Sequence, residues 1–208
     1  GSKEFSSIRY KYMPFILNPK LAKFFSRFQN KIKLQERFHS DGIKINSESP
    51  ECLDEPFWIN SAYSKLKFDN YLYPHELDDI SIKSYAYLLE KYSNIECKKR
   101  IVIKNNNNHL RIFKLSKFLR NSKFLILFRS PLAHSKSLLS QHKRFIELQK
   151  KDIFLKEYMN YLGHWEFGEN KKPFIYEENQ YLELTSLDAK TINYWMKQWI
   201  FTYDWILK

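Results

Sequence analysis

The spacing of apolar residues changes along the chain, from short continuous runs to helical periodicity. Two short apolar runs, Ile101–Lys104 and Phe124–Phe128, are typical of buried strands. Between them, apolar residues from Leu110 to Leu119 recur as they do on a helix. Residues 101–128 therefore predict a βαβ unit, whose two strands are parallel. We expect these strands to end at the same edge of the sheet, where ligands of open α/β sheets bind.

Helical periodicity dominates the remaining chain. Apolar residues share one face between Leu77 and Ser93, and a long helix is predicted over Ala133–Lys150. Asp152 is a candidate N-cap for the helix that follows, and Ser186 or Asp188 is expected to begin a final helix. The predicted fold class is α/β, with a parallel sheet flanked by helices.

The N-terminal part of the chain carries weaker signals. Asp41-Gly42 predicts a turn, and GIKIN after it predicts a short strand. Ser49-Pro50-Glu51 has the composition of a helix start, with a capping serine, a proline at the first helical position and an acid in the first turn.

Composition narrows the classes of protein. The 208 residues are 43% hydrophobic, and no linker or repeat divides them, so we expect a single domain over residues 1–208. No apolar run approaches the roughly 18–20 residues of a membrane span. Cys52 and Cys97 lack metal-ligand spacing, which predicts free, buried thiols and a reducing, cytoplasmic environment. His134 and His142 are eight residues apart, too far for the i, i+4 pairing of a metal site, so no metal is expected. The formal net charge of +12 favours anionic partners such as nucleotides.

Glycine usage limits how a nucleotide is held. The chain has only four glycines, and none of them has the spacing of a glycine-rich phosphate loop. A phosphate site in this chain must therefore use other donors.

Arg129 is the first candidate for such a donor. It follows the predicted strand Phe124–Phe128 directly, and its guanidinium fork suits a bidentate contact with phosphate. The residues after it begin a helix, whose free N–H groups favour an anion, and the hydroxyls of Ser135 and Ser137 follow closely. In the alternative interpretation, Arg129 pairs with a carboxylate and the serines cap the helix.

Arg129-Ser130-Pro131, with Ser137 eight positions after the arginine, resembles the 3′-phosphate-binding element of sulfotransferases that use 3′-phosphoadenosine 5′-phosphosulfate (PAPS). Other segments resemble the same family: HSDGIKINSESPECLDEPFW, IVIKNNNNHLRI, SLLSQHKRF and YLGHWEFG. The resemblance covers roughly residues 8–207. It implies a P-loop-NTPase-like sulfotransferase fold, PAPS as co-substrate, and contacts of Arg129, Ser130 and Ser137 with the 3′-phosphate.

The sequence departs from this family in one respect. The family's loop near the N-terminus, which holds the 5′-phosphosulfate, is not found among these residues. We therefore expect an incomplete fold, either a fragment of a larger enzyme or a shortened relative. Sulfuryl transfer by this chain alone is expected to be slow or lost, because the developing charge has fewer positive partners.

Candidates for the chemical step follow from the reaction type. His39 is the predicted base, because histidine accepts protons near neutral pH and Asp41 is close enough in sequence to orient it. Lys104 is expected to contact the bridging or sulfuryl oxygens. Glu51 and Glu55 are weaker candidates for the base. The alternatives are a surface histidine, a solvated lysine at a strand end, and acids that favour a first helical turn.

Asn106, Asn108 and His164 are predicted to contact the acceptor or the nucleotide. The alternatives are turn formation and helix capping for the asparagines and a structural role in a loop for His164. The leading hypothesis is a PAPS-dependent sulfotransferase that acts on a hydroxyl of a glycan, lipid or small metabolite. The alternatives are a non-catalytic nucleotide- or partner-binding module of the same fold and a basic nucleic-acid-binding protein. No specific nucleic acid is expected as a partner of the enzyme.

Overall fold

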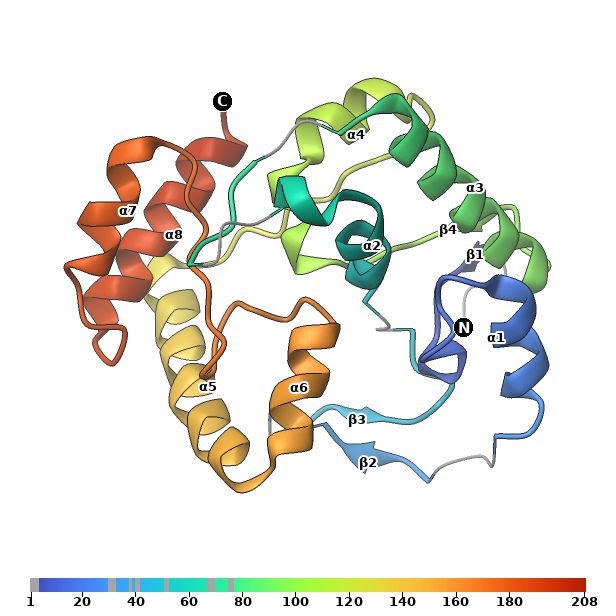
Figure 1. The fold of residues 1–208 in the computed structure, drawn as a ribbon, viewed down its shortest axis with the longest axis horizontal. Helices are drawn as coiled ribbons and strands as arrows, with labels where there is room; N and C mark the ends of the chain where they lie inside the picture. Colours follow the sequence, from blue (N-terminus) through green and yellow to red (C-terminus); the bar gives the residue numbers. More distant parts are fainter. Residues whose placement is uncertain are drawn as a thin grey trace. The chain divides into compact units, whose positions relative to one another are not determined.

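The computed structural model shows a mostly helical α/β protein (Figure 1). It describes residues 4–29, 33–37, 39, 42–50, 53–66, 70–74 and 77–208, with the side chains of 62–66 left out. The chain divides into two compact units. Unit 1 consists of Gly1–Ser61 and Leu77–Asn106, and unit 2 consists of Ala62–Glu76 and Asn107–Lys208.

The described residues of the first half of the chain form two small sheets. Its elements are β1 Phe5–Ser6, η1 Tyr10–Tyr12, α1 Pro19–Ser26, β2 Gln35–Glu36, β3 Lys44–Ile45, α2 Glu55–Leu66, α3 Asp79–Ile95 and β4 Arg100–Ile101. Strand β1 pairs in parallel with β4, so that Phe5 lies opposite Arg100, and β2 pairs antiparallel with β3. Within the described part of the chain, the parallel sheet therefore has two short strands.

The core of unit 1 forms where η1, α1 and α3 meet. Ile8, Tyr12, Ile16, Leu88 and Tyr92 are buried there. The Tyr92 hydroxyl donates a hydrogen bond to the Ile16 carbonyl at 2.9 Å. This buried hydroxyl therefore has a hydrogen-bond partner within the apolar cluster.

Unit 2 is helical. After η2 Asn106–Leu110, which begins at the last residue of unit 1, its elements are α4 Ile112–Phe118, α5 Pro131–Lys151, α6 Ile153–Tyr161, α7 Glu178–Thr185 and α8 Ile192–Ile206. Helix α5 packs along α8, the yellow and red helices of Figure 1. These two helices share a core with α6, α7 and the loop between α6 and α7. Its buried residues include Phe145, Phe167, Leu184, Trp195 and Phe201.

The helix predictions for the chain after residue 76 are confirmed, with one shifted start. Helix α3 matches the prediction from Leu77 to Ser93, and α5 matches Ala133–Lys150. Asp152 caps α6, because its side chain accepts hydrogen bonds from the N–H groups of Phe154 and Leu155. The final helix begins at Ile192, since Asp188 instead accepts a hydrogen bond from the Lys190 N–H in the preceding turn.

The signals near the N-terminus gave mixed results. The strand in GIKIN is present as β3. The helix start at Ser49 is wrong: the Ser49 hydroxyl accepts a hydrogen bond from the Asn46 N–H, and α2 begins at Glu55. Cys97 is free but exposed rather than buried, and Cys52 lies outside the described residues.

The predicted strand Phe124–Phe128 is wrong, and the βαβ unit with it. This segment is not a strand, and the side chains of Leu125 and Leu127 are 88% and 84% exposed. Its far end is held by α8 instead, because the Tyr203 hydroxyl donates to the Leu127 carbonyl at 2.6 Å. An apolar run becomes a buried strand only beside a strand that pairs with its backbone, and the described residues place none there. None of the described helices is long and apolar enough to cross a bilayer.

Candidate phosphate-binding site

Helix α5 begins with backbone donors that no side chain of the described residues caps. The helix is 21 residues long, with Ser130 as its N-cap and Pro131 at its first position. The Ser130 side chain makes no capping hydrogen bond. The first N–H groups of a helix have no partner within it, and together with the helix dipole they attract an anion.

Arg129 precedes this helix directly. Its side chain is exposed and forms no hydrogen bond or ion pair with any part of the chain that the structure describes. Its charge acts on His134 one turn into the helix: burial first, and then the charge of Arg129, lower the pKa of His134. Arg129 is therefore an exposed cation beside free helix donors. The alternative interpretation, an arginine paired with a carboxylate, is not what these residues show.

The polar side chains of the first two turns separate onto two faces. Ser130, His134 and Ser137 are four and three residues apart, and therefore share one face. Ser135 lies on the face of His142 and is fully buried, away from any exposed ligand. The positions from Ser130 to Ser137 span roughly 10 Å of helix. An anion that contacts both Arg129 and Ser137 therefore lies at the N-terminal end of α5, against the side of its first two turns.

Other predicted residues belong to unit 1. His39 is half-buried, and Lys104 and Asn106 are exposed. Asp41, the expected partner of His39, and Glu51 lie outside the described residues.

Glu55, the weaker candidate for the base, is part of a buried polar cluster in unit 1. Asn105 Nδ2 donates to Asp54 Oδ1 at 2.7 Å and to Glu55 Oε2 at 2.8 Å, and the Tyr85 hydroxyl donates to Asp54 Oδ2. Asp54 and Glu55 are both buried. Sequence reasoning missed Asp54 and Asn105, which are 51 residues apart. The sequence carries two separate signals for this cluster. One is the acidic pair Asp54-Glu55 before Pro56, and the other is the run of asparagines after the predicted strand Ile101–Lys104.

Two predicted acceptor contacts have partners within unit 2. The Arg111 Nε donates to Asn108 Oδ1 at 3.2 Å, and Arg111 is itself buried. His164 Nδ1 lies 2.6 Å from Glu166 Oε2. These contacts are the kind expected of the structural role that the sequence left open for both residues.

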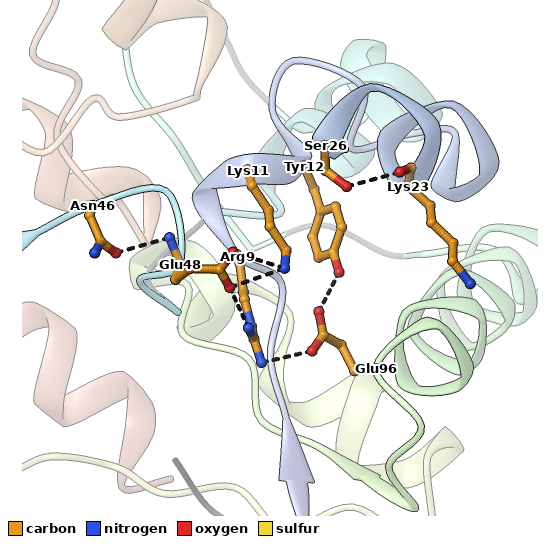
Figure 2. A network of polar contacts seen from close by, with 8 residues as sticks. All are labelled: Arg9, Lys11, Tyr12, Lys23, Ser26, Asn46, Glu48 and Glu96. Carbon is orange, nitrogen blue, oxygen red and sulfur yellow. Dashed lines mark hydrogen bonds and ion pairs between the residues drawn. The ribbon is translucent and has the colours of Figure 1, made fainter. Parts of the chain in front are cut away.

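Unit 1 contains a second group of basic side chains, shown in Figure 2. Glu48 contacts Arg9 at 2.5 Å and Lys11 at 3.0 Å, and Arg9 also contacts Glu96 at 2.7 Å. Burial acts to lower the pKa of Arg9, but Glu48 and Glu96 outweigh it and raise that pKa. Two carboxylates thus neutralise two cations, which leaves this network no net charge for an anionic ligand. Arg9 and Lys11 are thus paired with carboxylates, whereas Arg129 forms no ion pair with the described residues.

His142 on α5 is expected to make the stability of unit 2 depend on pH. The Gly168 N–H donates to His142 Nδ1 at 3.1 Å, so this nitrogen is an acceptor and is unprotonated. Burial, with the charge of Lys171, lowers the pKa of His142 from 6.5 to about 4. Burial likewise lowers the pKa of His109 to about 3.

The stability of the protein is therefore expected to fall as the pH is lowered from 6.5 towards 4. In this window the unfolded chain binds protons that the folded chain does not, so unfolding takes up protons. Above pH 6.5 both states are neutral at these histidines, and their contribution is fully present. Urea unfolding at several pH values measures this uptake. His142→Gln keeps an acceptor and should reduce the uptake by about one proton; an unchanged slope would contradict the assignment.

The described residues contain no group of three or more His, Cys, Asp or Glu side chains arranged to hold a metal ion. Comparison with known protein families, with curated proteins and with solved structures finds no match for this chain.

Proposed function

We propose that this chain binds the 3′-phosphate of PAPS through Arg129 and the first two turns of α5, as a PAPS-dependent sulfotransferase or a part of one. The observation that carries the proposal is the exposed Arg129, which has no carboxylate partner among the described residues and precedes an uncapped helix N-terminus. A guanidinium beside free N–H groups is the chemistry that a phosphate dianion requires. The Arg129-Ser130-Pro131 motif with Ser137 supports the nucleotide's identity by resemblance.

Each residue on this face has a role in the proposal. Arg129 holds two phosphate oxygens with its fork, and the hydroxyls of Ser130 and Ser137 donate to the same group. His134, whose pKa is lowered by burial, is neutral and adds a hydrogen bond without adding charge. The net charge of +12 raises the local concentration of the nucleotide.

The proposed reaction moves a sulfuryl group from PAPS to a hydroxyl of a glycan, lipid or small metabolite. The hydroxyl oxygen attacks sulfur in line, and adenosine 3′,5′-bisphosphate leaves. In the proposal, His39 takes the hydroxyl proton and Lys104 stabilises the charge on the leaving group or the sulfuryl oxygens. Asn106, Asn108 and His164 are the proposed acceptor contacts.

A non-catalytic nucleotide-binding module is the second candidate function. It is favoured by the glycine spacing, because these 208 residues contain no loop of the kind that cradles a 5′-phosphosulfate. Transfer of labelled sulfate from PAPS to a panel of hydroxyl acceptors separates the two functions, since a module binds the nucleotide but releases no labelled product.

Calorimetric titration with adenosine 3′,5′-bisphosphate tests the shared claim. Arg129→Ala is expected to weaken binding by about 1.5–3 kcal/mol, roughly 10- to 150-fold, the range for hydrogen bonds to charged groups. Arg120→Ala is the matched control, because Arg120 is also an exposed arginine of unit 2. An equal loss of affinity in both variants would mean that only the net charge of the protein matters, and it would contradict a phosphate site at Arg129.

A further inference from the structure

Unit 2 contains an open pocket that the proposed phosphate site does not use. It has a cavity volume of about 750 Å³, within the range of small-molecule sites. Its lining includes the side-chain amides of Asn70, Asn160 and Asn170, the ring of Tyr194, and two lysines, Lys171 and Lys172. Amides offer both donors and acceptors, which suits a ligand rich in hydroxyl groups.

Lys171 is held at a fixed place in this pocket. Its Nζ donates to the Tyr194 hydroxyl at 2.6 Å and lies 4.2 Å from the centroid of the same ring. Tyr194 is buried on α8. The loop that carries Lys171 is tied to α5, because the Gly168 N–H donates to His142 and the Glu169 N–H donates to Gln149 at 2.7 Å.

No carboxylate among the described residues pairs with Lys171. Glu169, which also lines this pocket, contacts Lys156 at 2.9 Å instead. Burial without a counter-charge lowers the pKa of Lys171 to about 8. At pH 7 the amine is then about a tenth unprotonated, on the order of a hundred times more than an ordinary lysine. An unprotonated lysine in a pocket is a nucleophile.

We propose that Lys171 is a reactive amine that forms a Schiff base with a hydroxylated aldehyde or ketone bound in this pocket. The nitrogen lone pair attacks the carbonyl carbon, and one proton passes from the nitrogen to the carbonyl oxygen, which gives a neutral carbinolamine. The carbinolamine then loses its oxygen as water while the C=N bond forms. The step needs no oxidant or reductant, and it is independent of the phosphate site.

Reductive labelling with glyceraldehyde and sodium cyanoborohydride at pH 7 tests this site. The extent of labelling at each lysine is followed by mass spectrometry of peptides from a protease that does not cleave at lysine. Lys171 is expected to react at least tenfold faster than Lys190, an exposed lysine of the same unit. Equal rates at Lys171 and Lys190 in the folded protein would overturn the proposal.

Two controls distinguish reactivity that depends on the folded pocket from the intrinsic reactivity of a lysine in its local sequence. In concentrated urea the rate advantage of Lys171 should disappear, because it depends on burial; an advantage that persists would overturn the role of the pocket. Lys171→Met should abolish the fast phase of labelling, whereas Lys190→Met should leave it intact. A fast phase that survives Lys171→Met would show that another lysine is the reactive one.

Discussion

Leu184→Ala is expected to cost about 2–5 kcal/mol of unfolding free energy, one of the two largest effects that the structure predicts. Leu184 on α7 is 0% exposed and belongs to the core cluster that includes Phe145 and Trp195. Alanine would remove apolar area from this core and leave a cavity that its neighbours fill only in part. Urea unfolding followed by circular dichroism measures the change.

Leu182→Ala is the matched control. Leu182 lies on the same helix two residues earlier, but it is 74% exposed. Its loss should change the unfolding free energy by no more than about 0.5 kcal/mol. Comparable costs for the two substitutions would mean that α7 does not present Leu184 to the core.

Asp54→Ala is expected to cost about 2–4 kcal/mol, because it leaves buried donors without their acceptor. Asp54 accepts hydrogen bonds from the Tyr85 hydroxyl and from Asn105 Nδ2 in unit 1. Asp54 is 0% exposed, so water does not replace these bonds without rearrangement. The same urea titration measures the loss.

Asp204→Ala serves as the control for the loss of a carboxylate. Asp204 is exposed on α8 and forms no hydrogen bond or ion pair within the described part of the chain. Its replacement should stay within about 0.5 kcal/mol of wild type. If Asp54→Ala is equally mild, the cluster with Asn105 and Tyr85 does not contribute to stability.

The sequence predicted those parts of the fold that depend on local signals. Helices α3 and α5 follow from apolar periodicity, and the Asp152 cap follows from the bonding of one side chain to N–H groups two and three residues ahead. The run Phe124–Phe128 failed for the opposite reason. Its burial as a strand depends on a neighbouring strand, and apolar composition alone does not supply one.

The candidate sites likewise contain residues that a local motif identifies and residues that only the fold brings together. Arg129, Ser130 and Ser137 lie within nine residues, so a sequence motif identifies them together. That no carboxylate of the described residues pairs with Arg129 is a tertiary property, which the spacing of residues does not predict. Lys171 and Tyr194 are 23 residues apart, and Asp54 and Asn105 are 51 apart, so only the fold reveals these pairs.

The central claim is that Arg129 binds a 3′-phosphate, and a cycle over protein and ligand tests it most directly. Wild type and Arg129→Ala are each titrated with adenosine 3′,5′-bisphosphate and with adenosine 5′-monophosphate, which lacks only the 3′-phosphate. Wild type should prefer the bisphosphate by about 1.5–3 kcal/mol, and Arg129→Ala should lose most of this preference. A preference that survives the substitution undiminished, or wild type that binds neither nucleotide, would contradict the account.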